Sequence, residues 1–502
     1  MRALAAALAL LLSLGISAQT SLVITNAKVF DNPRAEAVAI TGSTISAVGT
    51  NAQISALASP QTRVIDAQGR LLIPGFNDAH THPGTYTTSF SANGDINTAW
   101  PDIAAAISAA ADETPADIWI TAIVGPAIIN DPSITKQTLD QLAPRRKVFI
   151  NAFTGHGAVL SSVALNELHI TALEKDPAGG SFGRDAEGNL NGRLGEYAHY
   201  IADRRFAELA SDDEIVAGIR GYSDEAVRFG ITSSQAMATP GELRFAKTLR
   251  AAKVPLRIRH ITFPASTTAK LDFASGGALK LILDGTPIDR GAALRTAQYA
   301  DGTRGQLNFR DLAPFVKIAL DNDQQLLFHT AGDATVAAAL KAFSGTALKR
   351  PRLEHGDGLQ RDLFPLARKT GAIVVVNPTH FPFRSFYPAG EYMLAKSLVK
   401  ANIPLAIGSD GPMNPGLNLM FATARPDQPE ESLTREEALR AYTSGSAFAE
   451  NQETKKGTIA VGMLADLALL SQDVLTVPTE ALPETVSVLT IIDGKVVWEQ
   501  QQ

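Results

Sequence analysis

The chain has 502 residues, of which 45% are hydrophobic and 19% are charged, and its formal net charge is −6. This balance is typical of a folded globular protein and argues against a disordered chain. No run of Lys or Arg favours nucleic acid as a partner, and the lack of cysteine excludes disulfides, thiol catalysis and thiolate metal ligands.

The first 18 residues have the pattern of a secretory signal. Arg2 supplies a positive charge, an apolar run follows from Ala3 to Ile16, and Ala18 offers a small residue for cleavage. An uncleaved anchor is the alternative, but the run is shorter than the roughly 20 residues that span a membrane. We therefore expect a signal peptide at 1–18 and an exported protein, periplasmic or secreted, with no membrane attachment after cleavage.

Short β-rich runs follow at the amino-terminal end and return at the carboxyl-terminal end. An Asp-Gly pair in "IIDGKVVW" is typical of a tight hairpin turn. We therefore expect one small β-sandwich domain built from residues 19–72 and 456–502, with a larger domain between them. The β-rich runs are 21–31, 37–49, 62–75, 465–471 and 486–499.

The middle of the chain alternates apolar strand candidates with helical stretches such as 311–323 and 333–343. Eight such units predict a (β/α)₈ barrel of the α/β class, over residues 73–455. A doubly wound open sheet is the alternative, but no glycine-rich phosphate-binding motif follows an early strand. The strand candidates are 71–80, 230–237, 255–263, 278–285, 325–333, 351–357, 372–380 and 404–412.

About 150 residues separate the first two strand candidates, which is far more than an ordinary βα connection. This segment contains its own strand candidates at 119–125 and 147–153, and a predicted loop at 176–192. We interpret it as an insertion, at about 84–229, that lies over the mouth of the barrel and shapes a substrate pocket.

Residues that can bind metal recur at the carboxyl ends of the predicted barrel strands, where barrel active sites lie. Imidazole nitrogen and carboxylate oxygen are typical ligands of zinc and similar ions. Each residue alone has an ordinary structural explanation, but together they predict a metal site. The candidates are His80, His82, Lys280, His329, His355 and Asp410.

Lys280 is the unusual member of this set. Strand alternation places it on one face with Ile282 and Asp284, and a buried lysine is costly unless it is paired or modified. A neutral lysine amine can add carbon dioxide and become an anionic carbamate that bridges two metal ions. The alternative is an ion pair between Lys280 and Asp284, and the sequence leaves both open.

Ten stretches, which extend over nearly all of the mature chain and appear in the family's order, resemble the amidohydrolase superfamily, specifically its amidohydrolase-3 branch of YtcJ-like metal-dependent hydrolases. The matching stretches are "PGFNDAHTHP", "GHGAVLSSVALNELHI", "DPAGGSFGRDAEGNLNGRLGE", "GITSSQAM", "LKLILDG", "FHTAGDATV", "RLEHGD", "NPTHFP", "IGSDGPMNP" and "KGTIAVGMLADLALLS".

This resemblance implies a site of two divalent metal ions, zinc before others, with a hydroxide between them. His80, His82 and Asp410 would hold one ion, and His329 and His355 the other. A carboxylated Lys280 would bridge the two ions, and Asp410 would also take the proton from the attacking hydroxide. The resemblance further implies that His156 and His380 reach the substrate.

We therefore expect an exported hydrolase that cleaves a non-peptide carbon–nitrogen bond, in an amide or cyclic amide, of a small-molecule substrate. Two alternatives remain. One is a mononuclear deaminase of the same superfamily, which needs no bridging lysine, and the other is an exported binding protein without catalysis. The sequence does not identify the substrate, and it leaves a homodimer open.

Overall fold

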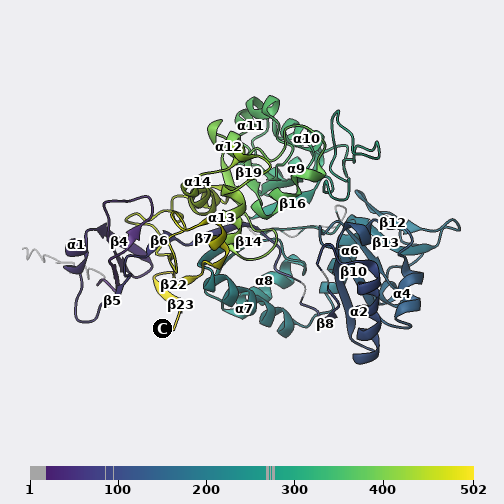
Figure 1. Cartoon of the computed structure of the whole chain (residues 1–502), viewed down its shortest axis with the longest axis horizontal. Helices are drawn as coiled ribbons and strands as arrows, with labels where there is room; N and C mark the ends of the chain where they lie inside the picture. The colour runs from purple at the N-terminus through teal and green to yellow at the C-terminus, as the bar shows by residue number, and fades with distance from the viewer. Residues whose placement is uncertain are drawn as a thin grey trace, which may run out of the picture.

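The computed structural model describes residues 19–84, 86–93, 95–266, 271, 273 and 277–501. The signal peptide predicted at 1–18 lies outside these residues. Figure 1 shows three regions along the molecule: small β-sheets from both chain ends, a central barrel, and a region built by residues 89–207. Within the described ranges, no helix is long and apolar enough to cross a membrane.

Eight parallel strands form the central barrel in the described part of the chain, and each overlaps a strand that the sequence predicts. A parallel bridge between Thr262 and Leu279 joins the third strand to the fourth. The barrel closes where the backbone N–H of Asp410 donates to the carbonyl oxygen of His80 at 2.9 Å. The observed topology is therefore the predicted α/β barrel. Its strands are β7 (Phe76–Thr81), β14 (Ile231–Ala236), β15 (Arg257–His260), β16 (Ala278–Ile282), β17 (Gln325–Thr330), β18 (Arg352–His355), β19 (Ile373–Val376) and β20 (Leu405–Ile407).

Burial explains why these residues form barrel strands. The sequence Ile-Val-Val-Val of β19 is buried throughout, as expected for a parallel strand that helices enclose. Phe328 of β17 stacks on Phe343 of the next helix with ring centroids 5.3 Å apart. The surrounding helices are α7 (Asp212–Arg228), α8 (Glu242–Ala252), α9 (Ala313–Asp321), α10 (Asp333–Phe343), α11 (Phe364–Thr370), α12 (Ala395–Lys400), α13 (Pro415–Thr423), α14 (Arg435–Arg440) and α15 (Ser446–Ala449).

Helix α7 shows how local sequence sets these boundaries. The hydroxyl of Ser211 accepts a hydrogen bond from the backbone N–H of Glu214, and the Glu214 side chain returns to the Ser211 backbone, which forms a capping box. Gly230, at φ +78°, then turns the chain into β14. Because Ile215 and Ile219 of α7 share a core cluster with Phe245 of α8, α7 belongs to the helical layer of the barrel.

Two small sheets combine residues from both ends of the chain. Their strand orders are β4-β3-β1-β5 and β2-β6-β21-β22-β23, and Ile40 and Ile491 share one core cluster. Asp493 and Gly494, at φ +55° and +72°, make the tight turn expected from the Asp-Gly pair. The strands are β1 (Leu22–Thr25), β2 (Lys28–Val29), β3 (Ala37–Thr41), β4 (Thr44–Gly49), β5 (Arg63–Asp66), β6 (Leu71–Pro74), β21 (Leu467–Leu470), β22 (Ser487–Ile492) and β23 (Lys495–Glu499).

Between β7 and α7 the chain builds a sheet of order β12-β13-β11-β10-β9-β8. The loop predicted at 176–192 is wrong, because this segment contains β12 and the start of β13, which pair antiparallel. Phe182, Leu190 and Leu194 are buried in one cluster, so their packing overrides the many Gly and Asp residues. The elements are β8 (Ser89–Ser91), α2 (Trp100–Glu113), β9 (Trp119–Val124), α3 (Pro126–Ile129), α4 (Lys136–Leu142), β10 (Val148–Ala152), β11 (Gly157–Leu160), α5 (Ser162–Glu167), β12 (Gly180–Arg184), β13 (Leu190–Glu196) and α6 (Tyr197–Ala207).

The remaining elements are short. They are α1 (Asn51–Ser55), the 3₁₀ helices η1 (Arg361–Leu363), η2 (Pro378–Phe386), η3 (Pro429–Glu431) and η5 (Thr479–Glu484), and the π-helical turn η4 (Ala441–Gly445).

Candidate active site

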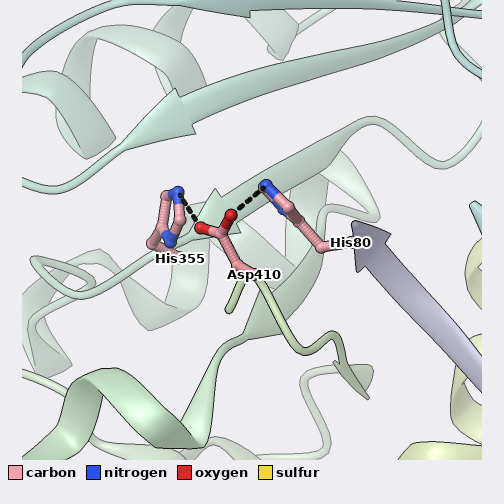
Figure 2. Close-up of side chains that lie close together, drawn as sticks. All are labelled: His80, His355 and Asp410. Atoms are coloured by element: carbon pink, nitrogen blue, oxygen red, sulfur yellow. Dashed lines mark ion pairs between the residues drawn. The ribbon is translucent and has the colours of Figure 1, made fainter. Parts of the chain in front are cut away.

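The carboxylate of Asp410 lies at the centre of the candidate site. Its Oδ1 is 3.6 Å from Nε2 of His80 and 3.6 Å from Nε2 of His82. Its Oδ2 is 3.7 Å from Nε2 of His355 and 3.9 Å from Nε2 of His380. Figure 2 shows the two carboxylate oxygens of Asp410 directed to His80 and His355 from the ends of different strands. The barrel thus brings together the candidates from β7, β18 and β20.

These separations fit a shared metal ion. Two ligand atoms at ordinary zinc distances in a tetrahedral shell lie about 3.4 Å from each other. Ligand atoms of His80, His355 and Asp410 all lie within 4.8 Å of one another. Direct hydrogen bonds between these groups would be shorter than the distances observed, so a cation between the atoms explains the arrangement better.

His80 is prepared for ligation through its other ring nitrogen. Its Nδ1 lies 2.6 Å from Oε2 of Glu354, and Arg352 binds the same carboxylate from 2.7 and 2.9 Å. A carboxylate accepts the Nδ1 proton and so leaves the lone pair on Nε2, which is the arrangement of many metal-binding histidines. Within the described residues, Nε2 of His80 is buried and has no hydrogen-bond partner.

His329 extends the site beyond the Asp410 cluster. Its ring centroid lies 4.4 Å from that of His355 and 4.8 Å from that of His156. Its Nε2 is also buried, and it accepts or donates no hydrogen bond within the described ranges. His329 therefore adds a further unpaired imidazole donor, within the described residues, beside the Asp410 cluster.

Burial keeps the imidazoles in the state that binds metal. It lowers the pKa of His80, and it lowers the pKa values of His329 and His355 well below their usual range. Burial alone would raise the pKa of Asp410, but the surrounding histidines, led by His80, hold that pKa well below its usual range. The site thus presents neutral imidazoles around an anionic carboxylate. His82, with 42% of its side chain exposed, lies at the open side.

Lys280 is buried inside the barrel with 1% exposure. Its Nζ lies 3.6 Å from Sδ of Met237, and it forms no ion pair with a carboxylate among the residues that the structure describes. Burial lowers its pKa to about 8, which leaves a fraction of the amine neutral near neutral pH.

The alternative pairing of Lys280 with Asp284 is not observed. Asp284 instead accepts hydrogen bonds from three backbone N–H groups and from one hydroxyl, and it ties the end of β16 to the loop after β17. The donors are the backbone N–H groups of Ala293, Ala331 and Gly332 and the Thr335 hydroxyl.

His156 also lies at the site, in the bend directly before strand β11 and outside the barrel. Its Nδ1 is 3.0 and 3.1 Å from the two carboxylate oxygens of Glu196 and 3.2 Å from the Tyr200 hydroxyl. Burial lowers the pKa of His156, but the charge and hydrogen bond of Glu196, together with the charges of Asp289 and Asp284, outweigh it, so the pKa is raised overall. Glu196 itself has φ +51°, a strained backbone of a kind often found at functional sites.

His380 belongs to the same group of rings. Its Nε2 lies 3.1 Å from the backbone oxygen of Asp410, and its ring stacks on His355 at 5.6 Å between centroids. All eight residues that the sequence singled out thus occur at one end of the barrel or in contact with it. The other three histidines, His169, His199 and His260, make no contact with Asp410 within the described residues, and we assign them no role in the site.

Sequence reasoning missed Glu354, Arg352 and Glu196. The strand "RLEH" carried a signal, because alternation places Arg352 and Glu354 on one face of a strand that is otherwise buried. Two opposite charges on one face of a buried strand indicate an ion pair with a functional role. Glu196 gave no comparable signal, because its partner His156 lies 40 residues earlier in the sequence.

The comparisons with known proteins place the chain in a family. The profile of the Amidohydrolase family matches residues 63–498. The chain is 25% identical to the N-substituted formamide deformylase of Arthrobacter pascens, over 93% of this chain and 96% of that protein. It is 24% identical to the putative amidohydrolase YtcJ of Bacillus subtilis (strain 168), over 94% of this chain and 97% of that protein.

Solved structures share the fold. An uncharacterized metal-dependent hydrolase from Pyrococcus horikoshii OT3 matches with a TM-score of 0.71 and 20% identity, over 91% of this chain and 99% of that chain. At this identity the likeness concerns the fold, which is the α/β barrel already described. The family match extends over most of the chain and confirms the family predicted from the ten sequence stretches. The chain therefore belongs to the Amidohydrolase family and is a metal-dependent hydrolase.

Proposed function

We propose that this chain hydrolyses a carbon–nitrogen bond in an amide or cyclic amide, using two divalent metal ions. Zinc is the first candidate for these ions. The observation that carries the proposal is the Asp410 carboxylate, which faces two histidines with each of its oxygens. The name of the N-substituted formamide deformylase, a relative along nearly its whole length, is consistent with amide cleavage.

His80, His82 and Asp410 would hold one ion, and His329 and His355 the other. Lys280 would bridge them after its neutral amine adds carbon dioxide, which forms an N–C bond and releases the amine proton. Its burial, its lowered pKa and its lack of a carboxylate partner in the described ranges support this assignment. When bound, the metal supplies Lewis-acid polarisation of the scissile carbonyl and lowers the pKa of a water nucleophile.

The chain's own residues would handle the protons. Asp410, anionic because of its histidine neighbours, takes the proton of the attacking water and can return it to the leaving nitrogen. His156, held by Glu196, would donate a hydrogen bond to the carbonyl oxygen as charge develops on it. His380, anchored through the backbone oxygen of Asp410, would contact the other side of the substrate.

A mononuclear deaminase is the second candidate, and one observation favours it. His80, His355 and Asp410 form a single compact group that could hold one ion without help from Lys280. The two candidates differ in the number of metal ions and in the reaction. The deaminase would release ammonia from a ring carbon, whereas the amide hydrolase would cleave an acyl group from an amine.

We also propose that the protein is exported, because residues 1–18 combine a positive start, an apolar run and a small residue at the end. The mature amino terminus should lie near Gln19. Terminal sequencing of the protein from its native compartment tests this, and recovery of Met1 or Arg2 at the terminus would refute cleavage.

The function itself is tested with a panel of amides, N-formyl amines, cyclic amides and aminated heterocycles, supplied to metal-loaded protein. We expect hydrolysis of at least one amide class by the wild type and none by Asp410→Asn. Release of ammonia from heterocycles alone would favour the deaminase. Binding of panel members without any turnover, by protein that holds its metals, would favour the binding protein and overturn the proposal.

A further inference from the structure

The 3₁₀ helix η2 carries a continuous aromatic face that begins at the metal-binding residues. A 3₁₀ helix has three residues per turn, so side chains three apart lie over one another. His380, Phe383 and Phe386 have this spacing, and successive ring centroids are 6.2 Å apart in both steps. The opposite face, with Pro378 and Phe381, is buried and anchors the helix.

The helix is also unusual for its length. It runs for nine residues, Pro378–Phe386, whereas 3₁₀ helices rarely continue beyond about four. In an α-helix, residues three apart are offset by about 60° around the axis, so the three rings would follow a spiral and not a straight row. The rarer helix therefore holds a row of rings that starts beside Asp410 and ends at Phe386, of which 42% is exposed.

A further aromatic ring faces this row from another part of the molecule. Phe153 follows β10, and its ring lies 5.8 Å from that of Phe383 in an edge-on arrangement. It is half-buried, as is Phe383. Aromatic side chains from two separate regions thus meet next to the site.

Phe386 lines a cleft of about 630 Å³ between helix α3 and the loops that follow β16 and β19. Its other walls are mostly apolar and include Pro132, Ile288 and Tyr299. Asn130 lines both this cleft and a smaller cavity of about 140 Å³ that contains His156. The cleft therefore lies beside the site: it shares Asn130 with the cavity of His156, and η2 carries both Phe386 of the cleft and His380 of the site.

The charges in the cleft indicate what it accepts. Among the described residues that line the cleft, Arg290 is the basic one, and its guanidinium is paired with Asp301 at 2.5 Å. Asp131 is the acidic residue of the lining. Because this cation is already paired, the described lining offers no free cation to a carboxylate on the ligand.

We propose that Phe383, Phe386 and Phe153 form a subsite for an uncharged aromatic group of the substrate, an inference that rests on the proposed amide hydrolysis. An aromatic ring there would pack edge-on or offset against Phe383 and Phe386 while its amide reaches Asp410. The substrates would then be amides with an aryl or arylalkyl substituent, rather than small amides or N-acyl amino acids.

The test compares N-benzylacetamide with N-methylacetamide, which share the acetyl half and differ in the ring. For the wild type, kcat/KM should be at least about tenfold higher for the benzyl compound. Phe386→Ala should lower that value about tenfold and leave the value for N-methylacetamide within about twofold, whereas Phe386→Tyr, which keeps a ring, should retain the preference. Phe90→Ala is the matched control, since Phe90 is 40% exposed on β8 and lies outside the cleft lining.

Equal kcat/KM for the two amides, or an unchanged preference in Phe386→Ala, would overturn the subsite. A higher kcat/KM for N-acetylphenylalanine than for N-benzylacetamide would overturn its uncharged character. If the wild type hydrolyses no amide, the proposed function fails, and calorimetric titration of the same amides into wild type and Phe386→Ala tests the subsite alone. Tighter binding of the benzyl compound, lost in the variant, would then support the subsite, and equal binding would overturn it.

Discussion

Glu354 is fully buried and is bound on one side by Arg352 and on the other by His80. Burial alone would raise the pKa of this carboxyl, but Arg352 and His80 hold it well below its usual range. A buried ion pair of this kind is weak evidence for stability, because desolvation offsets much of the attraction. Its position behind His80, a proposed metal ligand, indicates a different role, which is to fix the tautomer and orientation of that imidazole.

Glu354→Gln should weaken metal binding about 10- to 100-fold, since the amide no longer draws the Nδ1 proton of His80 as a carboxylate does. Titration of the metal-free protein with zinc and a competing chelator measures this. Glu437→Gln, on the surface helix α14, is the control and should bind zinc as the wild type does. Unchanged zinc affinity in Glu354→Gln would contradict the role given to this carboxylate.

Glu196 performs a similar task for His156. Because Glu196 raises the pKa of His156, the ring stays protonated to higher pH, and activity that needs the protonated ring falls as pH rises through that pKa. In Glu196→Gln the fall should come at lower pH, and kcat should drop about 10- to 100-fold with metal content unchanged. The pH profile of kcat checks this, and a profile identical to the wild type would exclude Glu196 from the reaction.

The candidate metal ligands could be proposed from the sequence because they recur at the ends of predicted strands, and their assignment as ligands stays a prediction. Their supporting residues were less predictable. Glu354 is one position before His355 on the same strand, yet it acts on His80, which is 274 residues earlier. Such a contact depends on how the barrel closes, and no local pattern contains that information.

At the scale of elements, β16 places two chemically different residues into the barrel. Lys280 lies near the metal-binding residues without a carboxylate partner in the described ranges, and Asp284 follows the strand and binds three backbone N–H groups and a hydroxyl. The sequence placed both on one face but could not decide whether they pair. In the structure Lys280 and Asp284 do not pair, because each side chain has other neighbours.

Lys280→Ala should lose metal and nearly all activity, because the bridging carbamate cannot form. Acetate or propionate should restore part of the activity by supplying a carboxylate in the space that the side chain leaves. Metal analysis and turnover with and without the acids measure both effects. A variant that keeps two ions and near-normal turnover would show that Lys280 does not bridge the ions.

Asp284→Asn should destabilise the fold by about 2–3 kcal/mol, because a side-chain NH₂ group then faces donors that now bind a carboxylate. Urea unfolding provides the measurement. Asp321→Asn is the control, since Asp321 makes an exposed pair with Lys317 on α9 and should change stability by less than about 0.5 kcal/mol. Equal stability of the two variants would contradict the anchoring role of Asp284.

Element prediction failed where packing overrides local preference. The segment 176–192 is rich in Gly and Asp and was expected to be a loop, yet Phe182 and Leu190 bury one side of a hairpin. The 3₁₀ helix η2 was also missed, because its Pro378 and Pro382 argue against a helix. In contrast, the helix expected at 333–343 occurs with those bounds, because its apolar periodicity and the residues that flank it both favour a helix there.

At the scale of the whole molecule, the barrel is held to the sheets from both chain ends. Arg257 of β15 pairs with Asp466, directly before β21, and with Asp493, in the β22–β23 turn. A strand such as β19 could be predicted from its apolar run because it is buried on both faces, whereas β15 is only half-buried. The six-stranded sheet between β7 and α7 could not be arranged in advance, since its order β12-β13-β11-β10-β9-β8 depends on pairings between distant segments.

The central claim is that this barrel end holds two divalent ions among His80, His82, Lys280, His329, His355 and Asp410. Metal analysis of the full chain, purified without chelator and with zinc supplied, tests it most directly. The account predicts about two ions per chain, bound stably through gel filtration. A single ion per chain that does not increase with added zinc would contradict the binuclear centre, and no bound ion at all would contradict a metal site here.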